Sequence, residues 1–62
     1  MKMTDIKEGK TYSNGTWERF VAEIVYMFDW HTTVGYIRNG KRFTCSLPTF
    51  ARWAKIEVRE GE

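Results

Sequence analysis

The stretch SLPTFARWAKI, residues 46–56, decides the fold of this chain. Ser46 can accept a hydrogen bond from the first turn of a helix, and Pro48 suits the start of a helix, where its missing N–H costs nothing. Phe50 and Trp53 stand three residues apart, so one face of the turn can bury both rings. The strand-like sequences GKRFTCSL and KIEV stand on either side. We therefore predict one short helical turn between the last two strands.

Turn signals divide the rest of the chain into short segments with strand character. Asn-Gly pairs occur at 14–15 and 39–40, and this pair favours tight hairpin turns because both residues tolerate a positive φ. The segments between the turns are rich in β-branched and aromatic residues, which favour strands. The predicted strands are 10–13, 16–28, 32–38, 41–47 and 55–59.

The segment 16–28 does not alternate cleanly between apolar and polar residues. Val21 and Ile24 fall in opposite phases, so a bulge between them would bring both into the core and bend the strand. A helix over 17–27 is the alternative, because Ile24 and Met27 also fit helical spacing. We favour the strand, since a hairpin turn precedes it and β-branched residues are frequent in it.

Side-chain alternation predicts which residues of the other strands face the core. These are Val34, Tyr36, Phe43, Cys45, Leu47, Ile56 and Val58. Five short antiparallel strands, with one helical turn before the last, form the layout of a small SH3-like barrel. We therefore predict an all-β, five-stranded antiparallel SH3-like barrel that forms a single domain over residues 1–62. Its ordered core is expected at about residues 6–58, with frayed ends.

Composition limits the classes of protein to consider. A chain of 62 residues buries only about 60% of its unfolded surface, so most of the three Trp, three Tyr and four Phe are expected in the core. The lone Cys45 cannot form an internal disulfide and fits a reducing compartment. We find no secretory signal and no apolar run near the ~20 residues of a membrane span, which predicts a cytoplasmic protein with no membrane partner. A net charge of +2 permits a nucleic-acid partner without requiring one.

Catalytic and metal-binding patterns are absent from the sequence. His31 is the only histidine, and no Cys/His spacing of the zinc type occurs. Cys45 falls in the inward phase of its strand, which favours a buried structural thiol over a nucleophile. No glycine-rich loop precedes a helix to hold a phosphate group. We therefore expect no enzyme activity, no cofactor and no metal.

Basic and aromatic residues alternate from the second hairpin onward. Such a combination can form a groove in which cations follow a phosphate backbone while bases stack on the rings. The alternative is that cations at a hairpin tip only keep the protein soluble and protect a strand edge. The residues of this hypothetical nucleic-acid groove are Tyr36, Arg38, Lys41, Arg42, Arg52, Trp53 and Lys55.

A surplus of aromatic residues suggests a second kind of surface. A barrel of this size cannot enclose every large side chain, so those near the turn at Asp29, together with Tyr12, are expected to be partly exposed. Exposed apolar patches often mark protein-binding surfaces. Alternatively, Trp30 folds back over an open end of the barrel. The predicted protein-binding residues are Met27, Phe28 and Trp30, with Arg38 and Arg42 as polar anchors.

The chain contains a spaced pattern that consists of GKTY, Arg19-x-Val21-x-x-Ile24, Val34-x-Tyr36, Cys45-Ser46-Leu47 and Phe50-Ala51-Arg52-Trp53. This pattern resembles short bacteriophage and prophage proteins that are similar to SH3-like barrels. The likeness covers about residues 6–58, and the stretch 27–31 departs from it.

This resemblance implies a small accessory protein that binds and blocks bacterial host machinery, such as CRISPR defence, a nuclease or replication proteins. A patch on the order of 800 Å² is enough for such a role. Our preferred hypothesis is therefore a non-enzymatic, inhibitory binding module for a host protein. The alternative is a barrel that binds nucleic acid. Self-association through an unpaired strand edge, for instance 10–13, is a third interpretation.

Overall fold

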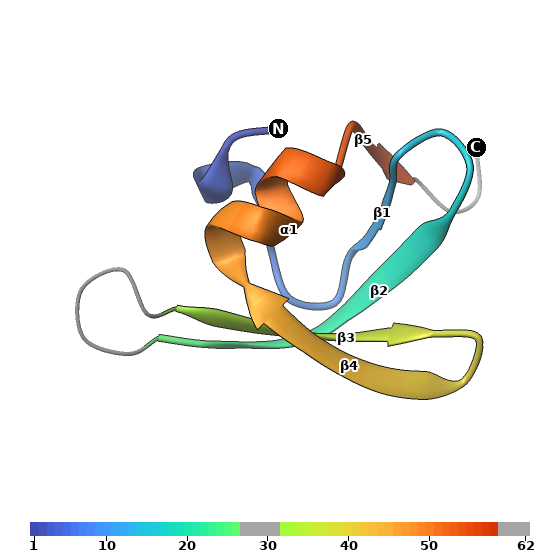
Figure 1. The fold of residues 1–62 in the computed structure, drawn as a ribbon. Helices are drawn as coiled ribbons and strands as arrows, with labels where there is room; N and C mark the ends of the chain where they lie inside the picture. Colours follow the sequence, from blue (N-terminus) through green and yellow to red (C-terminus); the bar gives the residue numbers. More distant parts are fainter. Residues whose placement is uncertain (27–31, 59–62) are drawn as a thin grey trace.

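The computed structural model describes residues 1–26 and 32–58. Five antiparallel strands form one sheet in the order β4-β3-β2-β1-β5, and a short helix precedes the last strand (Figure 1). The elements are the 3-10 helix η1 (Met3–Asp5), β1 (Thr11–Ser13), β2 (Glu18–Val25), β3 (Thr33–Arg38), β4 (Lys41–Ser46), α1 (Leu47–Trp53) and β5 (Ile56–Val58). The predicted antiparallel strands and the helix before the last strand are confirmed.

The sheet is open, with β4 and β5 as its two edges and α1 as the connection between them. Closure into a barrel therefore stays a prediction. The expectation that 10–13 is a free edge is wrong, because β1 pairs with β2 on one side and with β5 on the other. Ile56 in β5 is 55% exposed, so its predicted inward orientation is also wrong.

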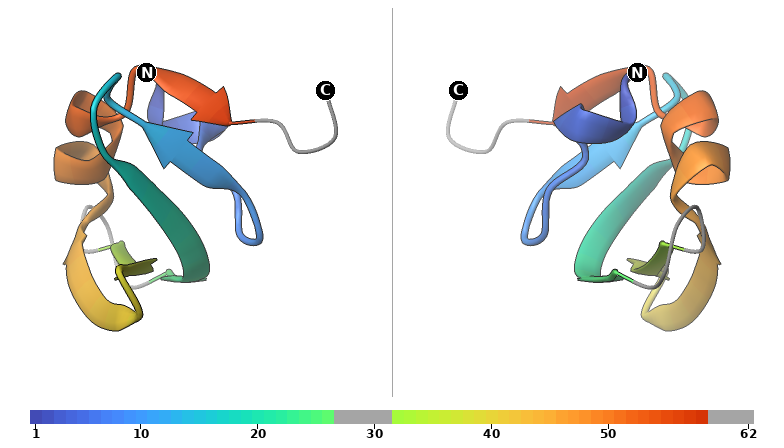
Figure 2. Two further views of the ribbon diagram at one scale, coloured as in Figure 1. Left: turned by 90° about the vertical axis from the view of Figure 1, so that its right-hand side faces the viewer. Right: turned by 90° about the vertical axis from the view of Figure 1, so that its left-hand side faces the viewer.

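A bulge in β2 bends this strand, which pairs with β1 on one side and with β3 on the other. The register with β3 shifts between Val21 and Glu23, as predicted, and both Val21 and Ile24 are buried. The helix considered over 17–27 is wrong over the described residues, which form a strand up to Val25. Figure 2 shows β2 running from the β1–β5 side of the molecule to the β3–β4 hairpin.

The two Asn-Gly pairs form different turns. Asn39 and Gly40 both have positive φ, 51° and 75°, and form the predicted two-residue turn between β3 and β4. The connection between β1 and β2 instead spans four residues. There the Asn14 side-chain oxygen accepts hydrogen bonds from the backbone N–H groups of Thr16 and Trp17, at 2.9 and 2.8 Å. The tight turn predicted at 14–15 is therefore wrong, because the asparagine side chain stabilises a wider loop.

Helix α1 begins as its sequence predicts. The Ser46 hydroxyl oxygen accepts a hydrogen bond from the backbone N–H of Thr49 at 3.4 Å, and Pro48 lies in the first turn. The Ser46 hydroxyl also donates to the Thr49 hydroxyl at 2.7 Å. Side-chain caps of this kind satisfy backbone donors that have no partner within the helix.

The first residues of the chain lie against the end of α1, although we expected them to fray. The amino group of Met1 donates hydrogen bonds to the carbonyl oxygens of Ala51 and Ala54, at 3.1 and 3.2 Å. These carbonyls belong to the last turn of α1 and to the residue that follows it. A cation at this end of a helix also interacts favourably with the helix dipole.

The core lies between α1 and one face of the sheet. Phe50 is fully buried at the centre of this core. Its ring centre lies 5.6 Å from the ring centre of Tyr36 and 5.5 Å from that of Trp53. We call the face of the sheet toward α1 the inner face and the opposite one the outer face. The buried hydrophobic residues are Ile6, Tyr12, Val21, Ile24, Val34, Tyr36, Phe50, Ala51 and Ala54.

Tyr12 belongs to this core, and its predicted exposure is wrong. Its ring meets Phe50 edge-on at 5.8 Å. Its hydroxyl donates to the carbonyl oxygen of Asp5 at 2.8 Å and accepts from the backbone N–H of Lys7 at 2.7 Å. Burial raises the pKa of Tyr12 above its ordinary value, while the hydrogen bond from Lys7 opposes part of the rise. The hydroxyl thus connects β1 by hydrogen bonds to the backbone of residues 5–7.

Candidate functional site

Cross-strand register decides which charged residues share a face. Directly paired residues point to the same side of an antiparallel sheet. Tyr36 pairs with Val21 on one side and with Phe43 on the other, which places Phe43 on the inner face beside two core residues. Arg38 pairs with Lys41 at the end of the same hairpin, two residues beyond Tyr36, so these two cations belong to the inner face as well.

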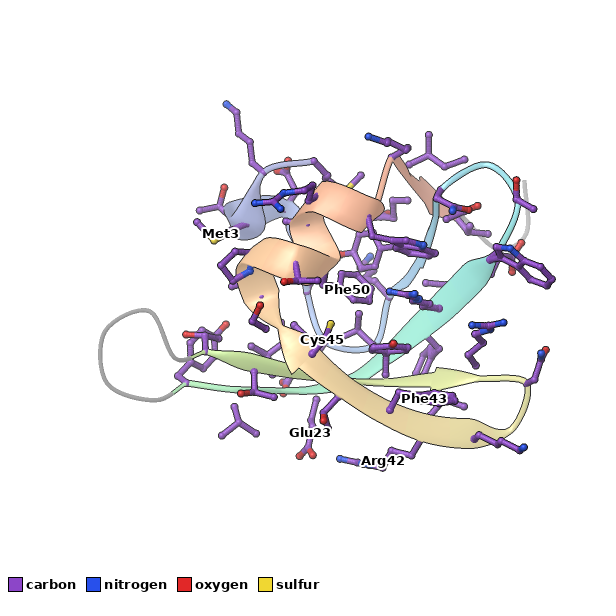
Figure 3. The ribbon with its side chains drawn as sticks, viewed as in Figure 1. Met3, Glu23, Arg42, Phe43, Cys45 and Phe50 are labelled. Carbon is purple, nitrogen blue, oxygen red and sulfur yellow. The ribbon has the colours of Figure 1, made fainter. Side chains whose placement is uncertain are left out.

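Four side chains from four different elements form a continuous stack at the rim of the inner face. The guanidinium carbon of Arg19 lies 4.0 Å from the ring centre of Trp53 and 4.6 Å from that of Tyr36. Tyr36 in turn stacks on Phe43, with ring centres 5.7 Å apart and an interplanar angle of 23°. Figure 3 shows Phe43 on the β3–β4 side of the core, away from Phe50. Each contact between a cation and a ring contributes about 0.5–2 kcal/mol. We call these four residues the arginine–aromatic stack.

Arg19 makes no hydrogen bond or ion pair with any other described residue. Its Nε atom is buried without a partner among residues 1–26 and 32–58, and its guanidinium group lies over the two rings. A buried donor without an acceptor is costly. The positive charge also reaches Cys45: burial raises the pKa of this thiol, and the charge of Arg19 opposes part of the rise. Cys45 is half-buried against the core, whereas a buried thiol was expected.

A second cation and ring lie beside this stack. The guanidinium carbon of Arg38 is 5.0 Å from the ring centre of Trp17. Trp17 is 52% exposed and Phe43 is 40% exposed, so both rings reach solvent. Neither Arg38 nor Lys41 has an ion-pair partner within the described part of the chain. We call the whole area the basic–aromatic surface; it consists of Trp17, Arg19, Tyr36, Arg38, Lys41, Phe43 and Trp53.

The structure brings together four of the seven residues predicted for a nucleic-acid groove. Three others lie elsewhere. Arg42 is on the outer face, where it forms an ion pair with Glu23. Arg52 lies on the side of α1 next to Met1, and Lys55 follows α1 with its backbone N–H bonded to β1. The four that come together are Tyr36, Arg38, Lys41 and Trp53.

Accessibility within the basic–aromatic surface differs from the expectation. Tyr36 is only 8% exposed and supports other rings from beneath, and Trp53 is half-buried under Arg19. The accessible rings are Phe43, which we expected to face the core, and Trp17. Sequence reasoning missed Trp17 and Arg19, although they stand two residues apart at the start of a strand and so share a face with Val21.

The structure describes only Arg38 and Arg42 of the predicted protein-binding residues. Met27, Phe28 and Trp30 lie outside the described residues. Arg38 and Arg42 point to opposite faces of the sheet, so they do not anchor one common patch. An apolar cavity of about 430 Å³ lies between η1 and the start of α1, with Tyr26 and Thr32 also in its lining.

The outer face carries apolar side chains of its own. Phe20 and Ile37 are direct cross-strand partners, 41% and 37% exposed. Arg42 pairs with Ile37 in the register, and its ion pair with Glu23 passes over Gly35. A Cβ atom at Gly35 would lie only 3.1 Å from a terminal nitrogen of Arg42, so the missing side chain makes room for this pair.

The chain was compared with family models, curated proteins and solved structures, and nothing matches it. Within residues 1–26 and 32–58, no group of three or more His, Cys, Asp or Glu side chains is placed to hold a metal ion. Over the same residues, no helix has the length and apolar character needed to cross a membrane.

Proposed function

We propose that this protein is a non-enzymatic nucleic-acid-binding module, folded as a small SH3-like barrel, that uses the basic–aromatic surface. The observation that carries the proposal is the combination of two exposed rings, Trp17 and Phe43, with the cations Arg38 and Lys41. Phosphate groups bind such cations, and bases stack on exposed rings without a need for sequence-specific hydrogen bonds. The barrel fold is supported by the strand order, in which the last strand pairs with the first.

Charge compensation distinguishes this surface from the rest of the sheet. Arg42 on the outer face is neutralised by Glu23, whereas Arg38 and Lys41 have no such partner among the described residues. A cation in an ion pair must give up its carboxylate partner before it binds a phosphate group. A cation without such a partner has no ion pair to break, so its full attraction is available to a phosphate backbone.

The test is a fluorescence anisotropy titration of a labelled oligothymidylate of about 12 nucleotides, which matches the site size of small single-strand binders. The double variant Arg38→Gln/Lys41→Gln should weaken binding by tenfold or more at low salt. The matched control Lys7→Gln/Arg42→Gln removes the same charge from other parts of the protein and should have a much smaller effect. Equal losses in the two double variants, or no binding by the wild type, would contradict the proposal.

A second candidate function is the inhibitory binding of a bacterial host protein in the host cytoplasm, as the resemblance to phage accessory proteins implies. It is favoured by the exposed Phe20–Ile37 pair on the outer face, because apolar pairs of this kind are typical of protein interfaces.

The two functions are separated by a pull-down from bacterial lysate, with and without nuclease, washed at low and at high salt. A discrete protein that survives both treatments, and that is lost with Phe20→Ser but kept with Arg38→Gln/Lys41→Gln, would support the second function. Nucleic acid recovered only at low salt would support the first.

A further inference from the structure

We infer that Arg19 is the phosphate-binding residue at the centre of the basic–aromatic surface, and that its ligand is single-stranded nucleic acid. This inference rests on the proposed function and names the residue and the form of the ligand. Its starting point is the state of Arg19, a cation held between two rings without a hydrogen-bond partner among the described residues.

The rings of Tyr36 and Trp53 determine how a ligand can approach. Their ring centres lie 4.6 and 4.0 Å from the guanidinium carbon, so the two rings occupy the space beside the guanidinium group. A hydrogen-bond acceptor must therefore approach the edge of the group, where its N–H bonds point. Nε is the buried nitrogen of the three, which leaves the terminal nitrogens at the open side. A planar fork of two N–H donors matches two oxygens of a phosphate group.

The stack also fixes Arg19 before a ligand arrives. A free arginine side chain must lose rotamer freedom when it binds, and this loss weakens binding. Here Tyr36 is buried in β3, Trp53 is anchored at the end of α1, and Arg19 lies between them. Since Tyr36 and Trp53 are themselves held by the core, the guanidinium group is oriented in advance.

The exposed rings favour a single strand over a duplex. Phe43 stacks on Tyr36 with one side, and its exposure of 40% leaves the remainder of the ring for a base. Trp17 offers a second exposed ring beyond Arg38. In a duplex, the faces of the bases are already stacked on one another, so only an unpaired strand can place a base on Phe43 while a phosphate reaches Arg19.

The experiment compares Arg19→Lys with Arg42→Lys, two variants that keep the charge and remove the planar fork. Anisotropy titrations use the oligothymidylate and a duplex of equal phosphate number. We expect Arg19→Lys to weaken single-strand binding about tenfold or more, because a hydrogen-bonded pair involving a charged group is lost. Arg42→Lys should stay within about twofold of the wild type. The duplex should bind the wild type more weakly than the single strand.

A second measurement does not depend on the stability of the variants. In wild-type protein with 15N-labelled arginine, the Arg19 Nε–H resonance should shift on addition of the oligothymidylate. Inorganic phosphate should produce a smaller shift in the same direction at much higher concentration, and acetate, which carries less charge, a weaker one still.

The outcomes separate the inference from the proposed function. If Arg38→Gln/Lys41→Gln loses binding while Arg19→Lys binds normally and the Arg19 resonance does not move, the role of Arg19 is overturned and the proposed function stands. Equal affinity for duplex and single strand overturns the choice of ligand. An equal response to acetate overturns the assignment to phosphate. If the wild type binds no oligonucleotide at all, the proposed function fails together with the inference.

Discussion

The two faces of this sheet use arginine in opposite ways. On the outer face, Arg42 is neutralised by Glu23 in a space that Gly35 leaves open. On the inner face, Arg19 and Arg38 lie over aromatic rings and have no carboxylate partner among the described residues. Rings hold a guanidinium group in place without neutralising its charge, and a carboxylate neutralises it. The comparison teaches that the surroundings of a cation, more than the number of cations, indicate where an anion can bind.

The largest expected effect is the loss of stability when a buried core ring is removed, compared with the removal of an exposed ring on the outer face. Phe50→Ala should lower the free energy of unfolding by about 3–5 kcal/mol, because the fully buried ring contacts Tyr12, Tyr36 and Trp53. Phe20→Ala on the outer face should cost less than about 1 kcal/mol, since its ring is 41% exposed. Urea denaturation followed by circular dichroism measures both. Similar losses would mean that the outer face is also part of a packed core.

Phe43 and Phe20 have nearly equal exposure, but only the loss of the Phe43 ring should weaken oligothymidylate binding. Phe43→Ala should weaken oligothymidylate binding by about 1–3 kcal/mol, the usual value of one stacked base. Phe20→Ala is the matched control and should leave binding unchanged. The anisotropy titration is made at a temperature where both variants are folded. A loss of oligothymidylate binding in the Phe20 variant alone would mean that the binding site is on the outer face.

Stability at high pH tests the buried hydroxyl of Tyr12. Its pKa is raised in the folded protein, so above pH of about 10 the unfolded chain loses this proton first and stability falls as the pH rises. At neutral pH, Tyr12→Phe should cost about 1–2 kcal/mol through the lost hydrogen bonds to Asp5 and Lys7. The difference between wild type and variant should then shrink above pH of about 10. A difference that grows with pH would contradict the burial of this group.

The smallest effect concerns the start of α1. Ser46→Ala should lower the free energy of unfolding by about 1 kcal/mol, because the helix loses its side-chain cap. Thr44→Ala, two residues earlier on the exposed side of β4, is the control and should change stability by less than about 0.5 kcal/mol. Thermal unfolding of both variants is the measurement. Equal effects would mean that the cap contributes nothing to the fold.

Local signals in the sequence were sufficient for much of the fold. The bulge between Val21 and Ile24, the Asn39–Gly40 turn and the start of α1 at Ser46 each depend on neighbouring residues, and all three are confirmed. The turn after β1 could not be predicted in this way. Asn14 uses its side chain to bond two backbone groups, and nothing in the Asn-Gly pair itself distinguishes this arrangement from a tight turn.

The candidate site was predicted only in part, because it depends on contacts between distant segments. Arg38 and Lys41 could be found from the hairpin alone. The position of Arg19 requires Trp53 to come from a helix more than 30 residues later, and strand alternation contains no information about that contact. The burial of Tyr12 likewise depends on Phe50 and on the N-terminal segment.

The central claim is that the cations of the inner face bind a phosphate backbone, and the salt dependence of oligothymidylate binding tests it most directly. The plot of log K against log salt concentration has a negative slope, and the account predicts that its magnitude falls by about 1.4 in Arg38→Gln/Lys41→Gln, which is about 0.7 for each lost phosphate contact. The slope should stay close to the wild-type value in Lys7→Gln/Arg42→Gln. Equal slopes in the wild type and in Arg38→Gln/Lys41→Gln would contradict the claim.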